Sequence, residues 1–197
     1  MSKQMNINPS LDSGGLDFYK NTVSRSKCLL EYGSGGSTVY AVNIAKVKSI
    51  ISIDTSKEWV EKVLKFTNLT ETELFIEHCD VGPVGDWGVP INRDKSSDYW
   101  RYTTRPWQIA KKHNLVPDTI LVDGRFRVAS FLYSLLCARV GTIIMFDDYL
   151  DRKHYFNVEN FCKLSEKHGR MGIFYVDHCY SIPDITASIT QYSTDWS

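Results

Sequence analysis

The chain has 197 residues, of which 43% are hydrophobic and 13% aromatic, so it can build the core of one α/β domain. Lysine and arginine together number 23, as do aspartate and glutamate, so no net charge favours nucleic acid or an anionic membrane. The sequence shows no apolar run long enough to cross a bilayer and no signal segment. We therefore expect one cytoplasmic domain over residues 1–197 without a nucleic-acid or membrane partner, and the sequence indicates no oligomeric state.

Short apolar runs alternate with helical patterns along the chain, which predicts a mostly parallel central sheet with helices on both faces. The expected strands cover residues 28–32, 49–53, 73–77, 118–122, 141–146 and 172–176. The expected helices cover residues 16–24, 37–45, 57–66, 107–113, 128–136 and 156–168. Residues 182–197 alternate apolar and polar side chains, so we expect an antiparallel edge strand there. Together these elements predict a Rossmann-like α/β fold.

The first expected strand runs into a glycine turn and then into the start of a helix. Gly33 and Gly35 let the chain bend sharply and bring backbone N–H groups against a nucleotide-like ligand. The dinucleotide-binding motif requires a third glycine at the position of Thr38, which weakens the case for NAD. A glycine-rich turn without a ligand is the alternative.

An acidic residue follows the second expected strand. In a doubly wound fold the carboxyl ends of the first two strands lie side by side, so Asp54 should reach the glycine turn. A carboxylate there can accept hydrogen bonds from both hydroxyls of a ribose. The alternative is a helix cap, since Asp54, Thr55 and Ser56 all precede the helix expected at 57–66. The glycine turn and this acid together favour a nucleoside-containing cofactor.

Residues 82–105 form a long stretch rich in glycine, proline, aromatic and charged side chains. Loops of this length in compact domains usually serve a function, so we predict a substrate-binding insertion here. A surface excursion held in place by aromatic packing is the alternative.

Carboxylates follow the fourth and fifth expected strands. Asp123 ends the fourth, and Asp147 and Asp148 end the fifth, so all three should meet at one edge of the sheet. Like charges this close must share a proton, a cation or an arginine. Arg125 and Arg127 could hold an anionic group, form a salt bridge to Asp123 or be solvated.

Several motifs together resemble one enzyme family. They are the acid and glycines of the first turn (Glu31, Gly33 and Gly35), Asp54, V-D-G-R-F-R at 122–127 and F-D-D-Y at 146–149, followed by Asp151, Arg152 and Tyr155. This set resembles a group of small bacterial class I S-adenosylmethionine (SAM) dependent methyltransferases. The resemblance implies the Rossmann-like class I fold and SAM as the cofactor. The cofactor-binding residues that it implies are Glu31, Gly33, Ser34, Gly35, Ser37, Thr38, Asp54 and Asp80.

The same resemblance bears on metal binding. Methyltransferases of the catechol O-methyltransferase type bind Mg²⁺ through an aspartate and an acid-amide pair at these strand ends, and this chain has aspartate in place of the amide. Arg125, Arg127 or Arg152 could neutralise the acids instead. We therefore expect no metal site, with Mg²⁺ as a less favoured alternative.

The function that these observations favour is methyl transfer from SAM to an oxygen of a small molecule or sugar-like metabolite. Such a transfer requires a group that removes or holds the proton of the acceptor. The expected catalytic residues are Asp123 and Asp148, with Arg125, Arg152 and Tyr155 orienting the acceptor. A SAM- or nucleotide-binding module without chemistry is the alternative, and an NAD-dependent oxidoreductase is less favoured.

Overall fold

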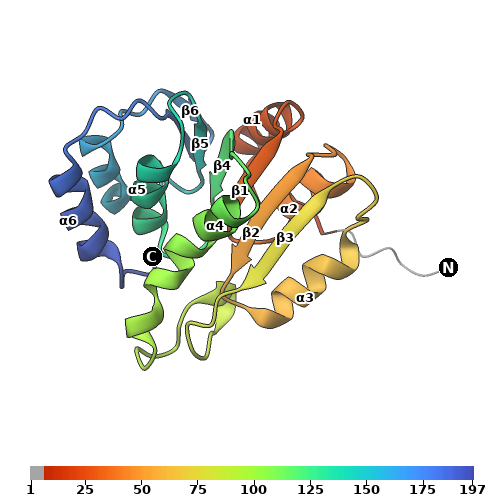
Figure 1. Cartoon of the computed structure of the whole chain (residues 1–197), viewed down its shortest axis with the longest axis horizontal. Helices are drawn as coiled ribbons and strands as arrows, with labels where there is room; N and C mark the ends of the chain where they lie inside the picture. The colour runs from red at the N-terminus through yellow and green to blue at the C-terminus, as the bar shows by residue number, and fades with distance from the viewer. Residues whose placement is uncertain (1–6) are drawn as a thin grey trace.

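The computed structural model describes residues 7–197, so residues 1–6 of the expected domain lie outside it. Its centre is a seven-stranded sheet with strand order β3-β2-β1-β4-β5-β7-β6 (Figure 1). Strands β1 to β5 are parallel, whereas β7 and β6 form an antiparallel edge. The strands are β1 Cys28–Tyr32, β2 Ser49–Asp54, β3 Glu73–His78, β4 Thr119–Val122, β5 Ile143–Phe146, β6 Glu166–His168 and β7 Met171–Tyr175. The Rossmann-like sheet predicted from the sequence is therefore confirmed.

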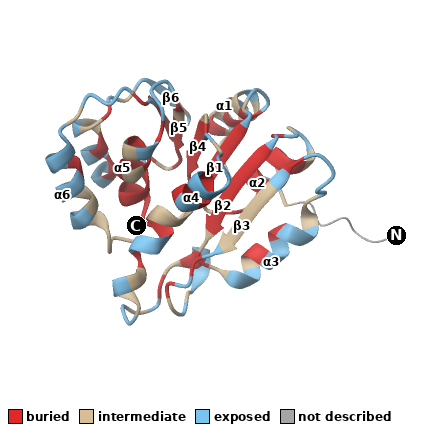
Figure 2. Ribbon diagram, viewed as in Figure 1, coloured by how far each residue is buried: buried red, intermediate tan, exposed pale blue. Residues whose placement is uncertain are grey.

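Helices cover both faces of the sheet, and the central strands between them are buried (Figure 2). The helices are α1 Ser13–Val23, α2 Gly36–Asn43, α3 Lys57–Phe66, α4 Trp100–Lys112, α5 Arg127–Cys137 and α6 Ile182–Tyr192, with short 3-10 helices η1 Asp86–Gly88, η2 Ser96–Asp98 and η3 Lys153–Asn160. Side chains of α1 and α2 form one apolar core with one face of the strands, and side chains of α4, α5 and α6 form a second core. Because β1, β2, β4 and β5 are buried on both faces, they are mostly apolar runs, which is why their positions could be predicted, whereas β3 at the edge of the sheet is only partly buried.

The helix expected over residues 156–168 is wrong. This stretch contains the end of η3 and then the edge strand β6, which pairs with β7 through a two-residue loop at Gly169 and Arg170. Gly169 has φ +59°, and glycine at the first position of such a loop is the signature of a tight hairpin turn. The charged residues of β6 suit a short exposed edge strand.

The edge strand expected over residues 182–197 is also wrong, because residues 182–192 form helix α6. The Ser181 side chain caps this helix by accepting a hydrogen bond from the backbone N–H of Asp184. Ile185 is buried and Ile189 packs on the same core one turn later. Apolar residues four apart fit a helix face as well as a strand alternation, so the pattern alone was ambiguous.

Helix α4 begins at Trp100, earlier than the expected start at 107, and contains Pro106. Proline usually disrupts a helix interior because it lacks a backbone N–H. Here the Tyr32 hydroxyl donates to the carbonyl of Thr103 at 2.8 Å, which gives the helix backbone an added partner near the proline. The stretch 82–105 therefore ends inside a helix. None of the helices within residues 7–197 has the length and apolar character needed to span a membrane.

Candidate functional site

The site is organised where the chain leaves β1 and β4, two neighbouring parallel strands at the centre of the sheet. The connection after β1 passes to one face and the connection after β4 to the other, which is where α/β sheets bind ligands. Gly33 follows β1 with φ +94°, and a Cβ on it would lie 2.7 Å from the Cα and N of Gly124. A Cβ on Gly124 would overlap the hydroxyl of Tyr102. The two strand ends can approach this closely only because both positions are glycine.

Glu31 lies beneath the glycine turn and is fully buried. Its carboxylate accepts hydrogen bonds from the hydroxyls of Ser37 and Thr38, in the first turn of α2, and from Ser52 Oγ at 3.0 Å. Burial raises the pKa of Glu31 to about 7, although the three hydroxyl donors oppose this shift. In this structure Glu31 therefore fixes the turn from below and presents no exposed surface to a ligand.

Asp54 at the end of β2 is bonded directly to the glycine turn. Its Oδ2 accepts from the backbone N–H of Ser34 at 3.0 Å, and its Oδ1 accepts from the backbone N–H of Ser56 at 2.8 Å. The expected proximity of Asp54 and the turn is therefore confirmed. The cap of α3 is Ser56, whose side chain accepts from the N–H of Trp59, so Asp54 is not needed for that role. Burial raises the pKa of Asp54 to about 6.

The residues present fit a nucleoside-containing cofactor. Each carboxylate oxygen of Asp54 accepts one backbone hydrogen bond, and a carboxylate oxygen has room for a second. Among residues 7–197, a Cβ on Gly35 would approach only the Trp59 indole nitrogen, at 3.8 Å, so the turn is open at this position, whereas the backbone of Asn8 lies against Gly36. Gly88 in η1 lies next to Thr55, the residue that follows Asp54, because the Gly88 carbonyl oxygen accepts a hydrogen bond from the Thr55 hydroxyl at 2.7 Å.

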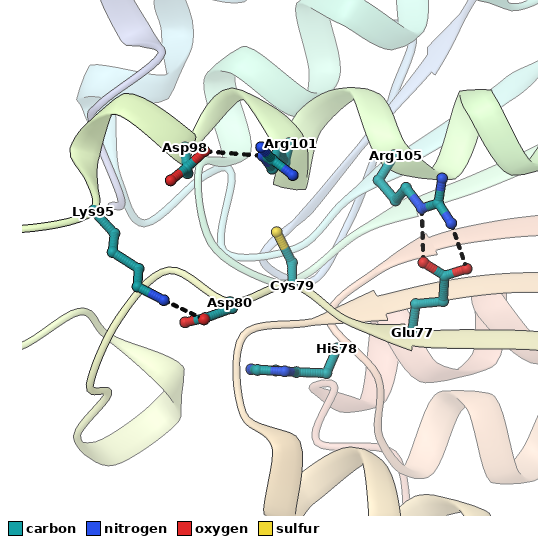
Figure 3. A pocket seen from close by; sticks show the side chains of 8 residues that line it. All are labelled: Glu77, His78, Cys79, Asp80, Lys95, Asp98, Arg101 and Arg105. Atoms are coloured by element: carbon teal, nitrogen blue, oxygen red, sulfur yellow. Dashed lines mark hydrogen bonds and ion pairs between the residues drawn. The ribbon is translucent and has the colours of Figure 1, made fainter.

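Asp80 lies apart from the turn, beyond β3, in a cavity of about 370 Å³. Figure 3 shows its carboxylate directed toward Lys95, with which it forms an ion pair. The hydrogen bond that Lys95 donates within this ion pair lowers the pKa of Asp80. The other lining residues are Glu77, His78, Cys79, Asp98, Arg101 and Arg105, of which Arg105 pairs with Glu77 and Arg101 with Asp98. The stretch 82–105 thus supplies one wall of a charged cavity at the end of β3.

The three carboxylates after β4 and β5 do meet, and arginines hold them. Buried Arg127, at the start of α5, pairs with Asp123 at 3.3 Å and with Asp148 at 3.1 Å. It also donates to the carbonyls of Gly124 and Asp147, each at 2.8 Å. Arg127 therefore joins the ends of β4 and β5 into one rigid unit.

Arg170 completes this cluster and was missed by the sequence analysis. It comes from the β6–β7 hairpin and binds buried Asp147 through two hydrogen bonds, of 3.1 and 2.7 Å, and Asp148 at 2.8 Å. Arg152 pairs with Asp148 at 2.8 Å and donates to the hydroxyl of buried Tyr155 at 2.9 Å. No motif identifies Arg170, because its position depends on a hairpin that was mistaken for a helix.

The cluster does not fit a metal ion. Within residues 7–197, no group of three or more histidine, cysteine, aspartate or glutamate side chains is arranged to bind a cation. Guanidinium groups occupy the carboxylate oxygens that Mg²⁺ would need, so a cation would have to displace them.

Asp123 differs from its two neighbours in its environment. Its side chain is 24% exposed, whereas Asp147 is fully buried. Burial raises the pKa of Asp123, Arg127 opposes the shift, and the nearby charges of Asp147 and Asp148 add to it. A carboxylate with a raised pKa at a partly open position is suited to exchange a proton near neutral pH.

Comparisons with known proteins agree with this fold. No profile of a known protein family matches the sequence, and no curated protein matches it. The structure is similar to that of a methyltransferase-like protein from Silicibacter pomeroyi, with a TM-score of 0.87 and 29% identity over 98% of this chain and 100% of that chain. An O-methyltransferase from Bacillus cereus, solved in complex with SAH, has a TM-score of 0.56 and 14% identity over 86% of this chain and 84% of its own. The chain therefore has the class I methyltransferase fold.

Proposed function

We propose that the protein is a SAM-dependent methyltransferase that transfers a methyl group to an oxygen of a small molecule or sugar-like metabolite. The observation that carries this proposal is the direct bond between Asp54 and the glycine turn, at the central strand ends of a methyltransferase fold. The motifs at 122–127 and 146–149 are our reason for grouping it with small bacterial methyltransferase-like proteins.

The cofactor side of the site is the glycine turn with Asp54. The free lone pairs of Asp54 would accept the ribose hydroxyls, and the backbone at Gly33, Ser34 and Gly35 would approach the remainder of the cofactor. Glu31 acts from below by holding Ser37 and Thr38 in the first turn of α2. Asp80 is a more distant cofactor contact, at the end of β3 where the adenine would extend.

When bound, SAM supplies an electrophilic methyl group on its sulfonium, so the protein has to align an acceptor oxygen and take its proton. Asp123 is the proposed base, because its side chain is the most exposed of the three carboxylates and its raised pKa makes the ionised form a stronger proton acceptor. Asp148 is paired with three arginines, so its proposed role is to fix Arg127 and Arg152 at the acceptor side. Buried Tyr155 positions Arg152 through its hydroxyl.

A second candidate is a SAM-binding module without chemistry. The observation that favours it is that arginines pair with all three carboxylates, so none of them is an unpaired base. The two candidates share the cofactor pocket and differ in turnover.

Calorimetry with S-adenosylhomocysteine (SAH), SAM and NAD tests the shared part first. We expect micromolar binding of SAM and SAH and none of NAD. Transfer assays on a panel of hydroxyl compounds then test chemistry, with Asp123→Asn as the inactive variant. Binding of SAH without turnover on any acceptor would favour the module, and binding of NAD instead of SAH would refute both.

A further inference from the structure

Arg125 differs from the other arginines of the site in its partners. Among residues 7–197, Arg125 forms no ion pair, and its Nε is buried without a hydrogen-bond partner. Its Nη1 lies 3.5 Å from the carbonyl oxygen of Trp196, which is the long limit of a hydrogen bond. Burial lowers the pKa of this guanidinium, and the nearby charge of Arg127 adds to the shift. A partly buried cation with such weak partners is unfavourable unless a ligand compensates it.

The neighbouring charges are balanced without Arg125. The acids and arginines of the cluster are Asp123, Asp147 and Asp148 with Arg127, Arg152 and Arg170. Three carboxylates therefore face three guanidinium groups. Arg125 pairs with none of these three acids and lies beside the proposed acceptor side of the site.

The position of Arg125 lies between the two halves of the site. It follows Gly124, which contacts Gly33 of the cofactor turn, and its backbone N–H donates to the Tyr102 hydroxyl at 3.3 Å. On its other side along the chain, Arg125 lies between Asp123 and Arg127, which belong to the carboxylate cluster. A ligand group next to Arg125 would therefore sit beside both the cofactor pocket and the carboxylate cluster.

We infer that Arg125 recognises an anionic group, a carboxylate or a phosphate, on the methyl acceptor. The planar guanidinium matches either oxyanion with two parallel hydrogen bonds, and the unpartnered Nε is one of the donors available. The weak contact to the Trp196 carbonyl is readily displaced by such a group. This inference rests on the proposed function and narrows its acceptor to an acidic hydroxyl compound.

The test measures equilibrium binding to the SAH-saturated protein, with benzoate and inorganic phosphate as anionic probes and benzamide as the neutral counterpart of benzoate. We expect the wild type to bind an anionic probe and not benzamide. Arg125→Met should weaken that binding at least tenfold, and Arg125→Lys should restore part of it. Arg25→Met removes the same charge from an exposed position before β1, at the opposite end of that strand from the glycine turn, and should leave probe binding unchanged.

The carboxylate of the cofactor is a competing source of the same chemistry. If Arg125→Met weakens SAH but not 5′-methylthioadenosine, which lacks that carboxylate, then Arg125 holds the cofactor and the inference is wrong. It is also wrong if the wild type binds SAH but no anionic probe, or if probe binding is equal in the wild type and the folded variants. Failure of the wild type to bind SAH would instead refute the proposed function.

Discussion

Gly33 and Gly124 lie with their backbones in contact, because a Cβ on Gly33 would fall 2.7 Å from the Cα and N of Gly124. This contact brings the turn after β1 against the turn after β4. The proposed cofactor turn and the carboxylate cluster are therefore adjacent through backbone atoms, with no side chain between them. Any side chain at either position must push the two strand ends apart.

Gly33→Ala should destabilise the protein more than Gly141→Ala. The two glycines have similar left-handed φ values, +94° and +86°, so alanine carries similar backbone strain of about 1 kcal/mol at each. At Gly141 a Cβ meets nothing within 4 Å, whereas at Gly33 it meets backbone. We expect Gly33→Ala to cost at least about 2 kcal/mol more in urea unfolding, as overpacking does in cores. Equal costs would contradict the close contact.

Glu31→Gln should change how stability depends on pH. In the folded protein the pKa of Glu31 is raised from 4.5 to about 7, so the folded state binds the proton more tightly than the unfolded state. The stability that this group contributes is complete below pH 4.5 and is lost as pH rises through about 7. Glutamine does not titrate and avoids this loss.

The measurement is the free energy of unfolding of wild type and Glu31→Gln at several pH values. The variant should gain on the wild type as pH rises from 4.5 to 7.5, by at most about 3 kcal/mol, since one pKa unit corresponds to about 1.4 kcal/mol. A difference between the two proteins that stays constant over this range would show that Glu31 titrates normally in the folded state.

Arg170→Met should destabilise the fold because it leaves the fully buried carboxylate of Asp147 without its bidentate partner. Breaking a buried pair from one side costs about 3 to 5 kcal/mol, and we expect the lower end because Arg170 is 31% exposed. Adding Asp147→Asn removes the stranded charge, so the double variant should be more stable than Arg170→Met alone. Arg101→Met, in an exposed pair with Asp98, should cost less than about 1 kcal/mol.

The central parallel strands β1, β2, β4 and β5 could be predicted because they are buried on both faces. The apolar runs ending at Tyr32 and Asp54 are therefore continuous, and the glycine and the acid that follow them mark the strand ends. The proximity of Asp54 to the glycine turn followed from topology alone. The secondary structure of the carboxyl-terminal segment was harder to predict, because the spacing of Ile185 and Ile189 fits the periodicity of a helix as well as that of a strand. In the structure this segment is a helix, capped by Ser181.

The pairing of charges within the site could not be predicted from sequence. Arg170 reaches Asp147 only because a hairpin brings it there, and Arg125, which follows Asp123 closely in sequence, forms no ion pair within residues 7–197. Which guanidinium meets which carboxylate depends on side-chain directions and turn geometry. Residue type and spacing establish only that these charges share one edge of the sheet.

The affinity for SAH should depend on the ionisation of Asp54. The ionised carboxylate accepts hydrogen bonds from both ribose hydroxyls, and protonation removes acceptor capacity. Because burial raises the pKa of Asp54 to about 6, affinity should rise with pH through that value and level off above it. Between pH 5 and 7 the ligand's own carboxyl and amino groups keep their charges.

Asp54→Asn should bind SAH about tenfold to a hundredfold more weakly at pH 7.5, a loss of roughly 1.5 to 3 kcal/mol, and should show a flatter pH profile. Calorimetry measures the affinity for SAH of the wild type and of Asp54→Asn at the same pH values, and circular dichroism of the variant checks that it is folded. Unchanged affinity in folded Asp54→Asn would remove this residue from the ribose site, and a wild-type pH dependence that persists in the variant would assign the titration to another group, such as Glu31 beneath the turn.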